Sequence, residues 1–163
     1  MNIATSGDQM LGSVDAKLEE MGIVLPSPPT PIANYVGFVR SGNLLFVSGQ
    51  LCFANGTLVA QGKLGAQVTV EEGQAAARTC AINLLAQVKV ALGDLNKVVR
   101  VIRLGGFINS TPDFLDGAKV MNGASDFMVA VFGAKGRHAR SAVNVPVLPT
   151  DATVEVEGTF EVQ

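Results

Sequence analysis

Residues 136–145 read Gly136-Arg137-His138-Ala139-Arg140-Ser141-Ala142-Val143-Asn144-Val145, a strand-forming stretch with an arginine near its start. After a turn signal at 148–151, the chain continues as Thr153-Val154-Glu155-Val156-Glu157. Two such runs joined by a short proline-containing turn pair most simply with each other. The spacing therefore predicts a β-hairpin near the end of the chain.

The predicted hairpin places charged side chains on neighbouring strands. With its turn centred near Pro149, Arg140 would lie opposite Glu157 and Ala142 opposite Glu155, and cross-strand neighbours are about 5 Å apart. A guanidinium presents a planar fork of donors that matches a carboxylate. One interpretation is an ordinary cross-strand ion pair, which adds little stability. The other is a site in which Arg140 binds a small anionic substrate.

Two further residues are unusual for their positions. His138, the one histidine of the chain, precedes Arg140 by two residues and would share its face of the strand. It can serve as an acid or base near neutral pH, or be an incidental surface histidine. Asn122 lies in the middle of a predicted helix beside Gly123, and neither residue favours that position. Either a close helix–sheet contact or a hydrogen bond into a site would account for the pair.

Composition narrows the possible classes of function. The chain has 163 residues, of which 48% are hydrophobic and 16% charged, and this predicts one domain with a substantial core. Its formal net charge is −2, without a cluster of lysine and arginine, so a nucleic-acid partner is not expected. Low charge also favours burial of surface against other copies of the same chain.

Cysteine usage and apolar runs predict a cytoplasmic protein without a metal, a disulfide or a membrane anchor. Cys52 and Cys80 are far apart and fit neither a metal-binding nor a disulfide pattern, so core packing is their expected role. Residues 1–9 lack the basic and apolar regions of a signal peptide. No apolar stretch is long enough to cross a bilayer.

The chain divides into residues 1–32 and 33–163. The first part reads as a short helix, with Ser13 as its N-cap, followed by a proline-rich arm at 26–31. The second reads as a compact unit in the order β-β-β-α-β-α-β-β. Its strands are expected at 35–40, 44–47, 58–59, 97–104 and in the two final runs.

Both helices of the compact unit have recognisable ends. The first follows a capping box formed by Thr69 and Glu72 and stops at Gly93. The second is expected to start at 111–113, with proline in its first turn, and to stop at Gly133. Two helices of this size would cover one face of a mixed sheet, so the class is α+β with the other face open.

These segments together resemble the YjgF/RidA family, which includes proteins once described as L-PSP endoribonuclease-like. The resemblance rests on Tyr35 with Gly37, the run Leu44-Leu45-Phe46-Val47-Ser48-Gly49-Gln50, Asn122, and Arg140-Ser141-Ala142-Val143 with Leu148-Pro149 and Val154-Glu155-Val156-Glu157. It covers residues 33–162, and the order of the motifs makes it specific.

The resemblance implies a chorismate-mutase-like fold assembled as a homotrimer, with sites between the subunits. It also implies cofactor-free hydrolysis of reactive 2-imino and 2-enamino acids to 2-keto acids and ammonia. By position, Arg140 is similar to the arginine that holds the substrate carboxylate, and Glu155 to the glutamate that positions the attacking water. Tyr35, Ser48, Gly49 and Asn122 resemble residues that line the pocket.

Departures from the family pattern indicate a divergent, longer subgroup. Many members have cysteine two residues after the arginine, where this chain has Ala142. The N-terminal arm and the loop at 105–111 are also longer than in short members. The alternative function is therefore a non-catalytic trimeric binder or sensor of small carboxylates, which would keep Arg140 and not need Glu155.

Overall fold

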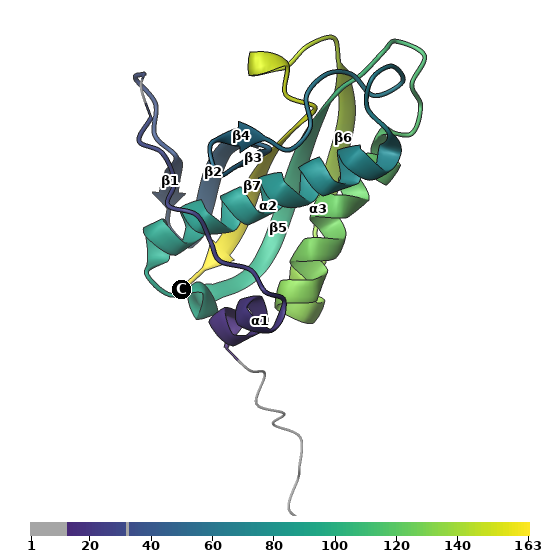
Figure 1. Cartoon of the computed structure of the whole chain (residues 1–163). Coiled ribbons are helices and arrows are strands. Elements are labelled where there is room, and N and C mark those ends of the chain that lie inside the picture. Colours follow the sequence, from purple (N-terminus) through teal and green to yellow (C-terminus); the bar gives the residue numbers. More distant parts are fainter. Residues whose placement is uncertain (1–12, 32) are drawn as a thin grey trace, which may run out of the picture.

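The computed structural model describes residues 13–31 and 33–163, and two helices pack on one face of a five-stranded sheet (Figure 1). The absence of a signal peptide, predicted from residues 1–9, lies outside the described residues. The helices are α1 (Val14–Glu20), α2 (Val70–Leu92) and α3 (Gly117–Phe132). The strands are β1 (Phe38–Ser41), β2 (Leu44–Leu51), β3 (Phe53–Ala54), β4 (Thr57–Leu58), β5 (Val98–Asn109), β6 (Ala139–Val145) and β7 (Val154–Val162).

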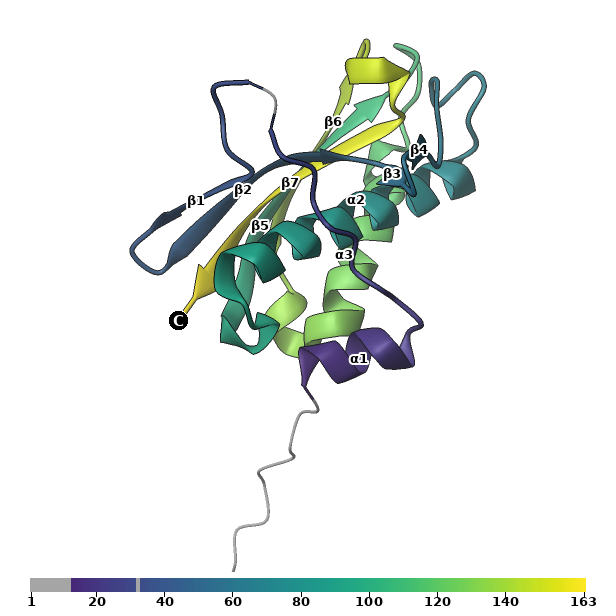
Figure 2. The same cartoon turned by 60° about the vertical axis from the view of Figure 1, so that its left-hand side comes forward.

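The large sheet has the strand order β1-β2-β7-β5-β6. All its neighbouring strands are antiparallel except β5 and β6, which run parallel. Both long helices lie against the same face, as Figures 1 and 2 show from two directions. The predicted α+β class with helices on one face is confirmed, although the expected strand at 58–59 is part of the separate β3–β4 hairpin.

The predicted terminal hairpin is wrong, because β5 lies between β6 and β7. Leu104 of β5 pairs with Arg140 on one side and with Gly158 on the other. The segment β5-α3-β6 is a parallel pair with a crossover helix, and such a pair needs a connection as long as a helix. The turn around Pro149 therefore does not join paired strands, and Arg140 does not lie opposite Glu157.

Helix α2 follows its predicted limits. Thr69 and Glu72 form the capping box, and Gly93 ends the helix with a φ of 72°. Its apolar stripe is buried against the sheet, including Cys80, and Cys52 is buried as well. The predicted core role of both cysteines is confirmed.

Helix α3 begins later than predicted, at Gly117 instead of 111–113. Thr111 donates its backbone N–H to Leu64 O, and Asn144 Nδ2 donates to Phe114 O. These contacts hold the chain in an irregular turn, so tertiary bonds override the local helix signal. The predicted end at Gly133 is confirmed.

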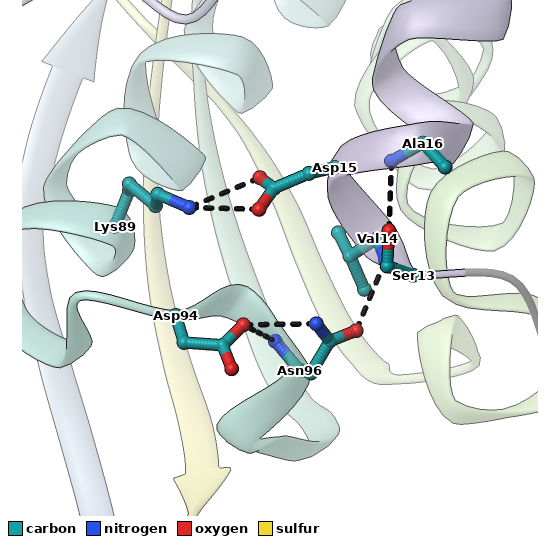
Figure 3. Close-up of polar contacts among 7 residues, drawn as sticks. All are labelled: Ser13, Val14, Asp15, Ala16, Lys89, Asp94 and Asn96. Carbon is teal, nitrogen blue, oxygen red and sulfur yellow. Dashed lines mark hydrogen bonds and ion pairs between the residues drawn. The ribbon is translucent and has the colours of Figure 1, made fainter.

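The N-terminal helix and arm lie against the compact unit. Val14 N–H donates to Asn96 Oδ1 over 3.0 Å, and Asp15 forms an ion pair with Lys89 at 2.9 Å (Figure 3). Leu18 is buried in the same core as the sheet. From α1 the arm crosses α2 before it reaches β1 (Figures 1 and 2). Among the described helices, none combines the length and apolarity needed to cross a membrane.

The sheet face opposite the helices exposes apolar side chains. Val39 and Phe46 are a cross-strand pair on this face, 54% and 45% exposed, and Val143 of the edge strand is 47% exposed. Apolar side chains gathered on one face of a sheet are typical of a surface that another protein covers.

Candidate functional site

Arg140 points to the helix side of the sheet. Its Nη1 donates to Asn122 Oδ1 at 3.0 Å and to Ser125 Oγ at 3.1 Å. Its Nη2 donates to Ala118 O at 3.3 Å. The three acceptors are spaced four and three residues apart and so lie along one face of α3. The guanidinium is thereby fixed against this helix.

Two donors of this guanidinium have no acceptor among the described residues. An arginine has five N–H groups, and the contacts above use both hydrogens of Nη1 and one of Nη2. Within the described part of the chain, Nε and the second hydrogen of Nη2 have no acceptor. A carboxylate can accept both bonds side by side.

His138 joins this group through Ser125. Its Nδ1 lies 2.6 Å from Gly136 O, and its Nε2 lies 3.0 Å from Ser125 Oγ. A carbonyl oxygen only accepts, so in the neutral ring Nδ1 carries the proton and Nε2 accepts from the serine hydroxyl. Ser125 in turn accepts from Arg140, which makes a continuous chain of hydrogen bonds.

Glu155 lies on the opposite face of the sheet, near the β2 edge. It pairs with Leu51 of β2 and Phe107 of β5. A Cβ atom at Gly49 would lie 2.0 Å from Glu155 Oε1, so glycine at this position leaves room for the carboxylate. Burial and, secondarily, the charge of Glu157 raise the pKa of Glu155.

A cavity of about 710 Å³ adjoins Glu155, and Tyr35 and Gly49 line it. Ser48 is beside this group but uses its hydroxyl to donate to Val36 O at 2.7 Å. The predicted residues thus form two groups. Arg140 and Asn122 make the first, and Tyr35, Ser48, Gly49 and Glu155 make the second.

The two groups are separated within one chain. Arg140 is level with Leu104 of β5 and Glu155 with Phe107, three residues along the same strand. With two strand spacings of about 4.8 Å and three residues of about 3.3 Å, their Cα atoms are about 14 Å apart. Because the odd offset also places their side chains on opposite faces, the adjacency expected from the hairpin is wrong.

The structure also shows the contacts of Glu157 and Gly123. Glu157 pairs with Arg103 at 3.5 Å on the open face, where Arg103 also donates to Ser141 Oγ at 3.0 Å. A Cβ atom at Gly123 would lie 2.0 Å from Gln74 O, so this glycine permits a close contact between α2 and α3. Asn122 supplies the hydrogen bond to Arg140 and Gly123 the close approach.

Sequence analysis did not identify Ser125 or Gln87. Both are polar residues on otherwise apolar helices, and Gln87 is only 6% exposed in the lining of the cavity beside Glu155. A polar side chain at a core-facing helical position is the signal that could have identified them. Among the described residues, no three histidine, cysteine or acidic side chains gather as a metal site would require.

The chain matches the family model described as "YjgF/chorismate mutase-like, putative endoribonuclease" over residues 15–160. It is 50% identical to protein TCP17 of Trypanosoma cruzi over 151 residues, which cover 92% of this chain and 94% of that protein. A crystal structure of Atu1372 from Agrobacterium tumefaciens, described as having unknown function, matches with a TM-score of 0.87 and 47% identity, covering 92% of each chain.

A more distant structure carries a small ligand. Escherichia coli TdcF with bound serine matches with a TM-score of 0.60 and 27% identity, covering 84% of this chain and 94% of that one.

Proposed function

This chain belongs to the YjgF/chorismate mutase-like family, and from that premise we propose that it hydrolyses reactive 2-imino and 2-enamino acids to 2-keto acids and ammonia. Support comes from its relative TdcF, whose structure contains serine, a small molecule with the α-carboxylate and α-nitrogen of such substrates. The observation that carries the proposal is Arg140, which α3 fixes while two of its N–H groups have no acceptor in the part of the chain that the structure describes.

In the proposed reaction, Arg140 binds the substrate carboxylate through these two donors. Glu155 accepts a proton from a water molecule as the water oxygen bonds to the imine carbon, and it then gives this proton to the nitrogen. Cleavage of the C–N bond then releases ammonia and leaves the keto acid, so one imine and one water give one keto acid and one ammonia. Fixed orientation and one proton-transfer group supply much of the rate enhancement in such a reaction.

The site would be completed by a neighbouring subunit. Arg140 and Glu155 lie on opposite faces of one chain, about 14 Å apart, which is too far for one short imino acid to contact both. We therefore place Arg140 of one subunit beside Glu155 of the next, in a homotrimer. The exposed apolar face of the sheet, with Val39, Phe46 and Val143, supports burial against other copies.

The first test generates a 2-imino acid in place with an amino-acid oxidase and follows release of the keto acid. Wild-type protein is expected to accelerate release, and Arg140→Ala to abolish the acceleration while the oligomer stays intact. No acceleration over a panel of imino acids would overturn the proposal.

Mixed oligomers test the shared site. Arg140→Ala and Glu155→Gln subunits are each expected to be inactive alone. When the two are refolded together in equal amounts, about a quarter of the interfaces combine an intact Arg140 with an intact Glu155, so activity should return to about that level. Mixtures that stay inactive, although mass spectrometry shows mixed oligomers, would refute the shared site.

The separation of Arg140 from Glu155 also supports a second candidate, a trimeric binder or sensor of small carboxylates. This function needs Arg140 alone. Carboxylate affinity that survives Glu155→Gln, together with no turnover of any imino acid, would favour it. Ribonuclease activity is not proposed, since a chain of net charge −2 without a basic cluster lacks the usual means of binding phosphates.

A further inference from the structure

The cavity beside Glu155 extends to the groove between the proline-rich arm and α2. Residues 26–31 form one wall, and Asn83, Ala86 and Gln87 of α2 form another. Its volume of about 710 Å³ lies in the range of pockets that hold drug-sized ligands, and it exceeds what a short-chain imino acid would fill.

The arm is a preformed wall. Four of the residues at 26–31 are prolines, which fix φ and favour an extended chain. Upstream, the arm is anchored by the buried Leu18 and by the ion pair between Asp15 and Lys89 (Figure 3). Ile23 and Leu25 also pack against the core. A wall held in this way loses little conformational freedom when a ligand binds.

Gln87 presents an unpaired amide to this cavity. The residue is 6% exposed, and its side chain has no hydrogen-bond partner among the described residues. A Cβ atom at Gly37 would lie 2.5 Å from Gln87 Oε1, so glycine at this position provides the space for the amide. Neither polar atom of this amide is fully enclosed without a partner, so the amide is accessible from the cavity, where a ligand group can replace the water that would otherwise pair with it.

The charges of the lining restrict that ligand. Glu155 is the one charged side chain in the described lining, and no lysine, arginine or histidine belongs to it. An anionic group would enter without a counter-ion and beside a carboxylate, which is unfavourable. Phe53 and the prolines provide apolar surface for a bulky group.

We propose that this cavity receives the side chain of the substrate and selects bulky, uncharged side chains that end in a hydroxyl or an amide, which Gln87 recognises. The inference rests on the proposed deaminase function, because Glu155, which lines the cavity, would act on the imine carbon. Gln87 is thus a residue that determines specificity, and the arm forms the wall opposite to it.

The test compares imino acids generated from tyrosine and phenylalanine, which differ by one hydroxyl. Wild-type protein should prefer the tyrosine-derived imine in kcat/KM, and Gln87→Met should reduce that preference about tenfold. Methionine has a similar length and helix propensity, so the fold should be retained. Gln74→Met, on the same helix and outside this cavity, is the matched control and should leave the preference unchanged.

Binding of the keto-acid products separates this inference from the deaminase proposal. Calorimetry should show that 4-hydroxyphenylpyruvate binds more tightly than phenylpyruvate, and that Gln87→Met removes the difference. If no imino acid is turned over but this pattern holds, the deaminase function fails and the specificity pocket stands. If turnover is normal but Gln87→Met changes neither preference, the pocket assignment is overturned and the deaminase function stands.

Discussion

Replacing Arg140 with lysine removes the fork and keeps the charge. One ammonium group cannot donate hydrogen bonds to Ala118 O, Asn122 Oδ1 and Ser125 Oγ and also bind a carboxylate through two parallel bonds. Loss of one hydrogen bond to a charged group costs about 1.5–3 kcal/mol. The proposed function therefore predicts that kcat/KM falls about 10- to 150-fold.

The same change should barely affect folding. Asn122 is exposed and Ser125 half-buried, so water can replace the lost donors. We expect a cost below about 1 kcal/mol, which lowers Tm by about 4 °C at most in a chain of this size. Thermal unfolding and the imino-acid assay on the same preparation measure both effects.

Arg103→Lys is the matched control for Arg140→Lys. Arg103 lies on the adjacent strand, points to the open face and pairs with Glu157 at 3.5 Å, and both side chains are nearly half exposed. Lysine at this position keeps the positive charge beside Glu157 and leaves the contacts of Arg140 in place, so kcat/KM should change less than about twofold. Full activity in Arg140→Lys, or an equal loss in both variants, would refute the role of Arg140.

Three other substitutions test separate parts of the structure. Burial and the charge of Glu157 raise the pKa of Glu155. A carboxyl with a raised folded-state pKa makes the folded protein less stable as pH rises through that value. Relative to wild type, Glu155→Gln should therefore raise Tm at about pH 8 and leave it unchanged below about pH 4. A variant whose Tm equals that of wild type at both pH values would contradict the raised pKa of Glu155. Gly49→Ala places a Cβ atom 2.0 Å from Glu155 Oε1 and should lower kcat with little change in Tm; unchanged kcat would show that the carboxylate position is not critical. Gly123→Ala places a Cβ atom 2.0 Å from the backbone oxygen of Gln74 and should cost about 1–3 kcal/mol in chemical denaturation.

The features that were predicted correctly from the sequence depend on contacts between residues close together in the chain. The capping box and the apolar stripe define α2, because both involve residues within a few positions of each other. Alternation along β6 likewise sets Arg140 on the face opposite to Val143. Its partners could not be predicted, since strand pairing is decided by segments far apart in the sequence. Because β5 pairs with β6, β7 lies in the middle of the sheet, between β2 and β5. The turn before β7 did not indicate this position.

The positions of Arg140 and Glu155 restrict the kind of oligomer that could bring them together. Arg140 lies on the edge strand β6, and Glu155 lies beside the part of β2 that β1 does not pair with in the described chain. In a two-fold dimer Arg140 could meet Glu155 of the other subunit only if both residues lay on one self-complementary patch, and here they lie on opposite faces of the sheet. A head-to-tail interface joins two different surfaces, and it closes as a ring of three or more subunits where the rotation between subunits permits. The proposed chemistry and a ring-shaped assembly therefore depend on the same interface, and a variant that breaks the ring into folded monomers should lose turnover while its helices and core stay intact.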